Sequence, residues 1–216
     1  FCLRKLLGSL PLAERKDLLV FDPMAGSGTF LYEAGLMGGA RAQADRTFAF
    51  QTWLTAPKIF RQSFLHNYRH PSAIAVNSLL ASDADEEVLG VAQKNLSGEE
   101  RAQFFVSDFE SRKWRENESF RRAPRERRLM IFNPPYGQRL RFANHQSLEP
   151  SVLEVLPEFS RVGLLVPKDW KAFSNLGWSQ SDPRTHEIWP VSNQGIECEF
   201  HVLSQNTSVK VPSSEP

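Results

Sequence analysis

The residues best suited to chemistry lie in two short segments, and the first is Asp22-Pro-Met-Ala-Gly-Ser-Gly-Thr-Phe30. It follows a short apolar run and precedes a helical pattern, so it predicts a glycine turn between a strand and a helix. Gly26 and Gly28 allow the main chain to approach a ligand closely, and the helix N-terminus offers free amides and a positive dipole end. The turn lacks the lysine of a phosphate-binding loop and the third glycine of a dinucleotide fold. It therefore predicts a nucleotide-like ligand without phosphate.

The second segment is Asn133-Pro-Pro-Tyr136. The prolines stiffen the turn, so the Asn133 amide oxygen and the Pro134 carbonyl can both accept hydrogen bonds from one NH2 group. Two such acceptors stabilise the positive charge that develops when a planar, poorly nucleophilic amine attacks. Tyr136 can stack on a base, a contact that contributes ~1–3 kcal/mol. A nucleotide-like methyl donor at the first segment, beside a planar amine at the second, predicts an aminomethyltransferase. Its predicted catalytic residues are Asn133, Pro134 and Tyr136.

Apolar runs and helical periodicity predict the elements that position these segments. After a helix at 1–10, strands are expected at 18–21, 78–82, 103–106, 129–132 and 162–166, with helices at 27–37 and 85–96, and 186–189 and 197–203 alternate like an antiparallel pair. This order predicts an α/β fold with a mainly parallel, doubly wound sheet and an antiparallel C-terminal hairpin. We expect one catalytic domain over 1–203, with a helical, aromatic-rich insert at 40–77 and a polar tail at 204–216.

Polar residues follow the predicted strands, where ligands bind in doubly wound sheets. They are Asp22, Asp83, Asp108, Asn133 and Lys168. Asp83 could accept two hydrogen bonds from a ribose diol, or it could cap the helix at 85–96. Asp108 could accept from an adenine amino group, or it could be a solvated loop acid. The convergence of five polar residues on one edge favours a binding site there.

Composition limits the partners, cofactors and location that are expected for this protein. The chain has 216 residues, a formal net charge of +1 and two cysteines without a CxxC pair. Such a charge draws in no nucleic acid over long range, so an RNA partner needs local patches or another domain. The five histidines show no metal-ligand spacing, and no metal is expected. No apolar run approaches the ~20 residues that span a bilayer, and a cytoplasmic location is expected from the cysteine usage. The start at Phe1 rather than Met predicts a piece of a longer protein.

The two segments, together with Asp83-Ala-Asp85 and the continuation Gly-Gln-Arg-Leu140, resemble the THUMP-associated S-adenosylmethionine-dependent RNA guanine-N2 methyltransferases. Within that group the likeness is to the bacterial enzymes that methylate large-subunit ribosomal RNA. Arg46-Thr-Phe-Ala-Phe-Gln-Thr-Trp53 and Asn193-Gln-Gly-Ile-Glu-Cys198 agree with it. The resemblance implies a Rossmann-like class I methyltransferase fold with S-adenosyl-L-methionine as donor. It implies that the RNA-binding THUMP domain precedes this chain; the oligomeric state stays open.

The resemblance also extends the list of expected site residues. We expect the donor to be bound by Asp22, Met24, Ala25, Gly26, Gly28, Thr29, Asp83, Asp108 and Asn133. Pro135, Arg139 and Lys168 are expected to contact the RNA substrate. The basic stretch at 112–128 is tempting as an RNA patch, but its last arginines precede a strand. They should therefore lie opposite the active edge, on a solvated face or against distant RNA or another domain.

Other functions share these motifs. Adenine-N6 methyltransferases acting on DNA or RNA, and enzymes that methylate a protein glutamine, also hold a planar NH2 group with an Asn-Pro-Pro-Tyr segment. The insert and Gly137-Gln-Arg-Leu140 favour guanine in RNA. A non-catalytic alternative is a donor-binding interaction domain of a larger ribosome-associated protein. The complete acceptor motif argues against that alternative.

Overall fold

The computed structural model describes residues 1–8, 10, 14–37, 74–135, 145–170, 173, 176, 184–193 and 195–205; for 145–147 it describes the backbone alone. Several predictions fall outside these ranges. They are the insert as far as residue 73, the side chains of Tyr136 and Arg139, and the tail from residue 206.

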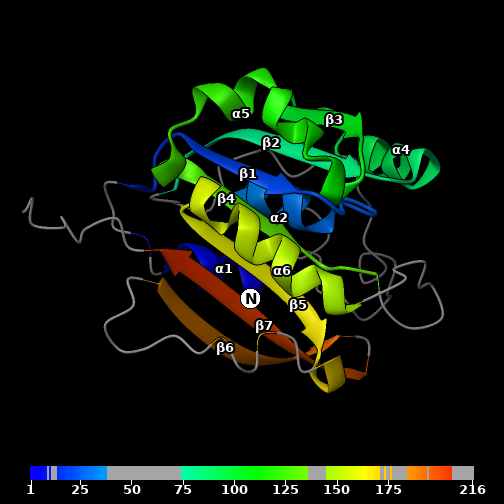
Figure 1. The fold of residues 1–216 in the computed structure, drawn as a ribbon. Coiled ribbons are helices and arrows are strands. Elements are labelled where there is room, and N and C mark those ends of the chain that lie inside the picture. The colour runs from blue at the N-terminus through cyan, green and yellow to red at the C-terminus, as the bar shows by residue number, and fades with distance from the viewer. Residues whose placement is uncertain are drawn as a thin grey trace, which may run out of the picture.

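The described strands form one sheet of seven strands in the order β3-β2-β1-β4-β5-β7-β6 (Figure 1). The strands are β1 (Leu18–Asp22), β2 (Val76–Asp83), β3 (Ala102–Val106), β4 (Arg128–Phe132), β5 (Arg161–Pro167), β6 (Arg184–Asn193) and β7 (Ile196–Gln205). The first five run parallel, and β7 pairs antiparallel with both β5 and β6. The predicted mainly parallel sheet with an antiparallel C-terminal hairpin is confirmed.

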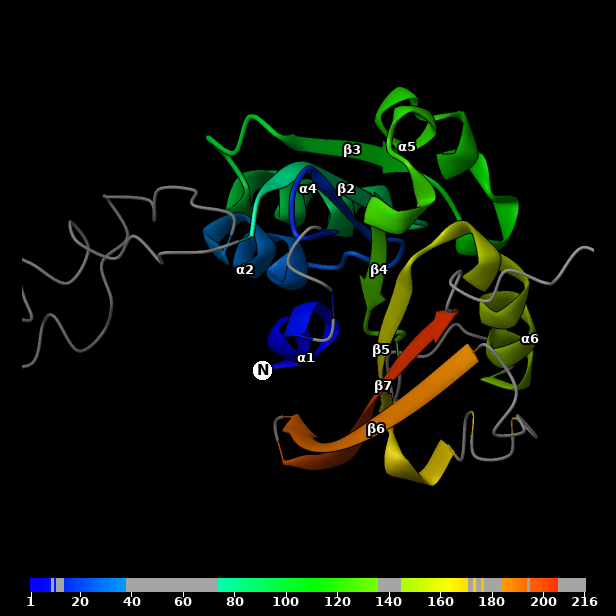
Figure 2. The ribbon, with the colours of Figure 1, turned by 90° about the vertical axis from the view of Figure 1, so that its left-hand side faces the viewer.

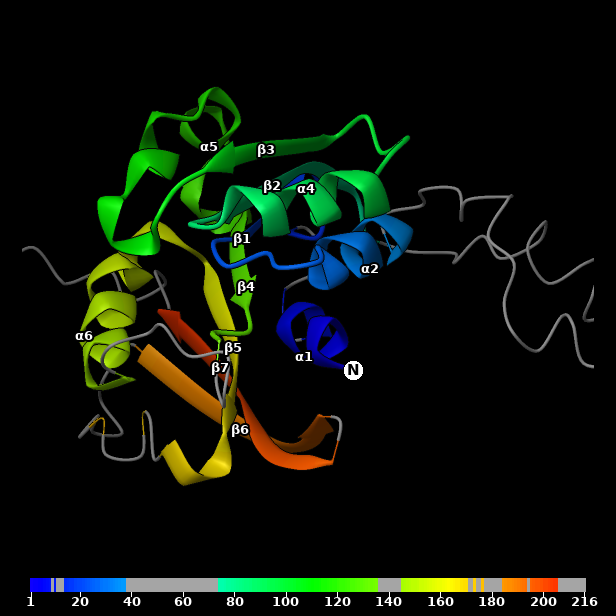
Figure 3. The same ribbon diagram turned by 90° about the vertical axis from the view of Figure 1, so that its right-hand side faces the viewer.

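Helices cover both faces of the sheet, which explains why its central strands read as continuous apolar runs. Helices α1 (Cys2–Gly8), α2 (Thr29–Met37) and α4 (Glu86–Asn95) lie on one face, and α5 (Glu118–Arg122) and α6 (His145–Val155) lie on the other (Figures 2 and 3). Alternate residues of β1 enter the two cores: Leu18 and Val20 join the first, and Leu19 and Phe21 join the second.

Element boundaries differ from the sequence prediction where a local constraint outweighs periodicity. Helix α2 begins at Thr29 rather than Ser27, because Gly28 has a φ of +76°, outside the helical region. Helix α6 was missed, and Pro150 inside it interrupts the sequence pattern. The hairpin strands are longer than expected, and β7 continues through Ser204 to Gln205. Short 3-10 turns, also missed, are η3 (Phe109–Ser111), η4 (Lys113–Glu116), η5 (Arg125–Arg127), η7 (Leu156–Glu158) and η8 (Lys168–Trp170).

The hairpin is fastened to the parallel strands by close packing. Phe200 of β7 lies against Gly163 of β5, where an added Cβ would come within 2.7 Å of the Phe200 ring. Within the described part of the chain, no helix is long and apolar enough to cross a membrane.

Candidate functional site

The predicted site residues lie on one edge of the sheet. Asp22 and Asp83 are the last residues of β1 and β2, and Asn133 and Lys168 directly follow β4 and β5. Asp108 lies two residues beyond β3. Because these five strands are parallel, their carboxyl ends share an edge, which faces the viewer in Figure 3. The chain order reverses between β1 and β4, the position at which doubly wound sheets bind ligands.

The glycine turn between β1 and α2 is held by main-chain hydrogen bonds. The Gly28 amide donates to the Ala25 carbonyl at 2.7 Å, and the Ala25 amide donates to the Ser82 carbonyl of β2 at 2.9 Å. A side chain also holds the turn: Asn95, the last residue of α4, donates from its amide to the Ser27 carbonyl at 2.9 Å. The sequence reading missed Asn95, because nothing in its local sequence separates it from an ordinary polar residue in a last helical turn.

Gly26 and Gly28 each lack a side chain for a different structural reason. A Cβ on Gly28 would lie 3.1 Å from the Ala92 Cβ and 3.1 Å from Leu96 Cδ1, so this glycine lets α4 pack against the turn. Among the described residues, a Cβ on Gly26 would meet only the Met24 carbonyl oxygen, at 4.0 Å. Both glycines are predicted to let a ligand approach, and among the described residues Gly26 is the one with open space beside it.

Asp83 connects the glycine turn to the start of α4. Its Oδ2 accepts from the Gly26 amide at 3.0 Å, and its Oδ1 accepts from the Asp85 amide at 3.0 Å. The helix cap that we considered for Asp83 belongs to Asp85, whose Oδ1 accepts from the Glu87 and Val88 amides. Each Asp83 oxygen therefore keeps a second lone pair for another donor.

Asp22 is a buried carboxyl, with 2% of its surface exposed. Its Oδ1 accepts from the Met24 amide at 3.1 Å. The pKa of Asp22 is raised to about 8, chiefly because burial disfavours the charged form; the Met24 hydrogen bond opposes this shift and the nearby Asp83 charge adds to it. At neutral pH the carboxyl is therefore mostly protonated, and a cation beside it would favour the ionised form.

The remaining residues expected at the donor side surround this turn. Ala25 is buried, Met24 is half-buried against the second core, and the exposed Thr29 hydroxyl lies 3.0 Å from the Ser27 hydroxyl. Asp108 is exposed, and its Oδ1 accepts from the Glu110 amide at 2.7 Å, which caps η3. The ring of Phe109 lies 5.8 Å from the ring of Phe132, so it packs in the core.

Asn133 carries an unusual polar atom. Its Oδ1 is buried, and it finds no hydrogen-bond partner among the residues that the structure describes. A buried amide oxygen without a partner costs about 1–3 kcal/mol. Such an atom calls for an explanation, and at the carboxyl edge of the sheet a ligand that donates to it is one. Pro134 is buried and Pro135 is half-buried.

Lys168 lies on the expected edge but has a protein partner. Its Nζ is 3.3 Å from Glu197 Oε2 of β7, and both side chains are largely exposed. Exposed pairs of this kind contribute ~0–1 kcal/mol, so the pair with Glu197 holds Lys168 only weakly.

The basic stretch at 112–128 is largely occupied by contacts within the protein. Arg115 pairs with Glu158, Arg122 pairs with Glu118, and Arg127 pairs with Asp17. Arg125 Nε donates to the Pro157 carbonyl at 2.6 Å, and Arg128 Nε donates to the Ala123 carbonyl at 2.8 Å. The last arginines lie at the amino end of β4, away from the site, as predicted. Their contacts fasten the fold.

Comparison with known proteins gives a consistent picture. The family described as "RMKL-like, methyltransferase domain" matches residues 11–182. The "Putative RNA methyltransferase slr0064" of Synechocystis sp. is 27% identical over 90% of this chain and 53% of its own length. The "Ribosomal RNA large subunit methyltransferase K/L" of Buchnera aphidicola is 29% identical over 88% of this chain and 28% of its own length. The chain thus spans about half or less of these relatives.

A solved structure shares the fold. The structure of "SMU.472, a putative methyltransferase complexed with SAH" superposes with a TM-score of 0.57 at 19% identity, covering 90% of this chain and 49% of that one. At this identity the likeness concerns the fold, which is that of Rossmann-like methyltransferases.

Proposed function

Because the chain belongs to the RMKL-like methyltransferase domain family, we propose that it transfers a methyl group from S-adenosyl-L-methionine to the exocyclic N2 amine of a guanine in RNA. Large-subunit ribosomal RNA is the proposed substrate, in line with the printed name of the Buchnera aphidicola relative. The proposal includes a cytoplasmic location and an RNA-binding domain outside this sequence that delivers the substrate.

The donor would lie along the carboxyl ends of β1, β2 and β3. The open space at Gly26 allows close approach to the main chain, and the free lone pairs of Asp83 suit the two hydroxyls of a ribose. The buried carboxyl of Asp22 lies beside this turn and would interact with the positive charge of the donor. The second oxygen of Asp108 could accept from the adenine amine. The SAH complex of SMU.472 supports a donor of this kind.

The acceptor amine would lie at Asn133. The observation that carries the proposal is the buried Oδ1 of that residue, which has no hydrogen-bond partner among the described residues. An incoming NH2 group would donate to Oδ1 and to the Pro134 carbonyl. These acceptors would hold the amine lone pair toward the methyl group, the alignment that transfer requires. Tyr136 lies outside the described residues and keeps its expected role of stacking on the base.

In the transfer itself, the amine nitrogen forms a bond to the methyl carbon while the carbon–sulfur bond of the sulfonium breaks. The sulfonium becomes a neutral thioether, and the methylated amine loses a proton to water. Asn133 and Pro134 would stabilise the positive charge on nitrogen during this step. A guanine within a helix must first leave its stack to reach the site.

The test is methyl transfer from radiolabelled S-adenosylmethionine to unmodified large-subunit ribosomal RNA, followed by nucleoside mass spectrometry. We expect N2-methylguanosine, lost in Asn133→Ala. Donor affinity in that variant should fall far less than turnover, because Asn133 is one of several residues expected at the donor. Asn77→Ala is the matched control, since Asn77 bonds Asp17 before β1, at the opposite edge; it should keep activity.

Other products decide between the alternatives. N6-methyladenosine would keep the acceptor geometry and overturn the base. A methylated glutamine in a protein substrate would overturn RNA as substrate. Donor binding without transfer by the full-length protein would favour a non-catalytic, donor-binding domain. Collapse of donor affinity in Asn133→Ala would overturn the acceptor assignment.

A further inference from the structure

Arg112 has an unusual backbone. It lies directly after η3, between the donor side of the site and η4, in the left-handed conformation with φ 56° and ψ 18°. A non-glycine residue in this region carries strain of order 1 kcal/mol, which persists only where surrounding contacts hold it. Main-chain bonds with Phe109 and Arg115 help to hold Arg112 in this conformation, and its own side chain adds further contacts.

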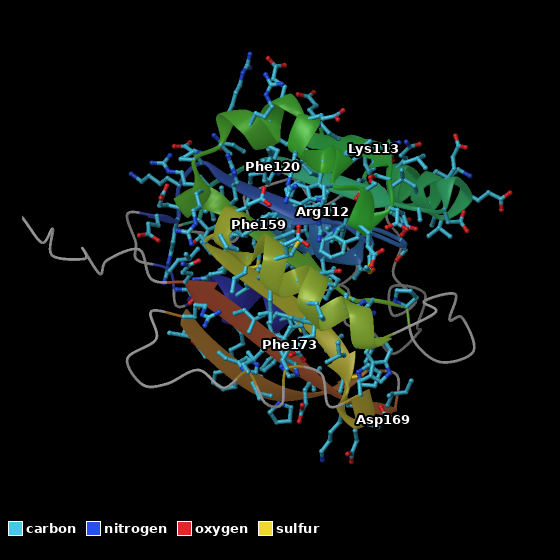
Figure 4. All side chains as sticks on the ribbon, viewed as in Figure 1. Arg112, Lys113, Phe120, Phe159, Asp169 and Phe173 are labelled. Carbon is cyan, nitrogen blue, oxygen red and sulfur yellow. The ribbon has the colours of Figure 1, made fainter. Side chains whose placement is uncertain are left out.

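The Arg112 guanidinium bonds the Phe109 carbonyl and two groups of helix α6. Nη1 donates to the Phe109 carbonyl at 3.2 Å, and Nη2 donates to the Ser151 carbonyl and to Glu154 Oε2 of α6 at 3.3 and 3.2 Å. Its Cζ lies 4.8 Å from the centre of the Phe109 ring. The side chain is 12% exposed. Figure 4 shows Arg112 between the segment that follows β3 and helix α6.

The places that Arg112 joins belong to the two halves of the proposed site. Phe109 directly follows Asp108, which is proposed to contact the adenine. The Phe109 ring packs on Phe132, the residue before Asn133. Helix α6 packs in the same core cluster as Phe132. The guanidinium therefore joins the segment after β3 to α6, and both pack on β4, the strand that precedes the acceptor segment.

We infer that Arg112 is a positioning residue that aligns the donor with the acceptor amine by fastening the Asp108–Phe109 wall to α6. This rests on the proposed function, since it assigns a task to the same site. Arg112 touches neither reactant. A planar guanidinium with forked donors can bond the Phe109 carbonyl and α6 at once, whereas a single ammonium cannot reach both.

The test compares Arg112→Met and Arg112→Lys with wild type in steady-state methyl transfer. We expect Arg112→Met to lower kcat on the order of 10- to 100-fold, the effect of a small misplacement of reactants. The KM for RNA should stay within about twofold, because bulk RNA binding does not use this residue. Arg112→Lys should not restore kcat, although it restores the charge.

Two neighbouring cations supply matched controls. Lys113 is exposed, so Lys113→Met removes the same charge without the contacts. Arg115 pairs with Glu158 at 2.5 Å, so Arg115→Met removes an ion pair to the turn after α6. Both variants should keep kcat within about twofold. A wild-type kcat in Arg112→Met, or an equal loss in Arg115→Met, would overturn the inference.

A second readout needs no methyl transfer. Amide hydrogen exchange is measured with and without S-adenosylhomocysteine. In wild type, bound ligand should slow exchange in both 108–111 and 148–155; in Arg112→Met the slowing should be confined to 108–111. Unchanged protection of α6 in the variant would overturn the inference. If the wild-type protein methylates another base, guanine-N2 as the proposed target is overturned. The inference about Arg112 is then tested by comparing kcat for the product that is formed.

Discussion

The Gly26 amide donates to Oδ2 of Asp83 at 3.0 Å, although 57 residues separate them in the chain. This bond joins the glycine turn after β1 to the end of β2, so one carboxylate shapes the turn and offers its remaining lone pairs to a ligand. Asp83 also accepts from the Asp85 amide. Loss of the Asp83 carboxylate should affect ligand binding more than the stability of α4.

Asp83→Asn should lower the affinity for S-adenosylhomocysteine by at least about tenfold, because the amide NH2 would face a backbone N–H that needs an acceptor. Calorimetric titration measures it. Asp85→Asn is the control, since asparagine caps a helix as well as aspartate does, and it should bind within about twofold of wild type. Equal losses in both variants would show that the cap, not the Asp83 bond, governs binding.

The two turn glycines should separate stability from binding. Gly28→Ala should lower the free energy of unfolding by about 1–3 kcal/mol, because φ is +76° and the new methyl group meets Ala92 and Leu96 at 3.1 Å. Gly26→Ala should cost less stability and more ligand affinity, because its methyl group would fill open space beside the ligand. Urea unfolding and titration of both variants test this. The reverse order of effects would contradict it.

The buried carboxyl of Asp22 should couple ligand binding to pH. Its pKa is raised to about 8 by burial, so at pH 7 a cationic ligand must displace its proton. S-adenosylhomocysteine, with its ammonium group, should therefore bind with release of a proton, and its affinity should rise between about pH 6 and 8. Titration at pH 7 in buffers of different ionisation enthalpy counts the proton. Asp22→Asn should release none.

The same group should make folding stability fall as pH rises. As pH increases from about 4, the unfolded carboxyl loses its proton while the folded one keeps it until about pH 8. The folded state is thus favoured at the low end of this window. Asp22→Asn should flatten this slope in urea unfolding between pH 5 and 8 (about three points suffice). An unchanged slope would mean that Asp22 is ionised in the folded protein.

Arg101 should stabilise the edge of the sheet at which β2 and β3 begin. Its guanidinium donates to the Val76 carbonyl at 2.7 Å, to the Gly35 carbonyl at 3.3 Å, and to Glu99 at 2.6 Å. Arg101→Met should lower the free energy of unfolding by about 2 kcal/mol. Arg122→Met, which breaks the exposed pair with Glu118, should cost less than about 0.5 kcal/mol.

Arg101 also sets a pH dependence. Its hydrogen bond lowers the pKa of Glu99 below the usual value. This contribution to stability is therefore present above the unfolded pKa of about 4.3 and disappears as pH falls through the folded pKa. The destabilisation by Arg101→Met, followed by urea unfolding, should shrink on acidification. A constant difference down to low pH would contradict the assignment.

The fold class, and the gathering of the predicted site residues on one edge of the sheet, followed from sequence alone. The apolar runs that became β1, β4 and β5 are buried on both faces, a pattern that favours central parallel strands. Because parallel strands share a carboxyl edge, Asp22, Asp83 and Asn133 could be brought together without knowing any contact between them. Helix α6 escaped prediction, because Pro150 weakens its local signal and packing of Leu148 and Val152 against the sheet outweighs it.

The tertiary structure decided what local patterns leave open. Which glycine serves packing and which leaves space depends on α4, whose Ala92 and Leu96 lie far along the chain from Gly28. The raised pKa of Asp22 depends on burial. Whether Asn133 Oδ1 has a partner among the described residues depends on what surrounds it. Residue types and spacing therefore determined the chemistry that is possible here. Long-range packing decided which atom is buried, charged or left to bind, because burial and charge depend on neighbours in space rather than in sequence.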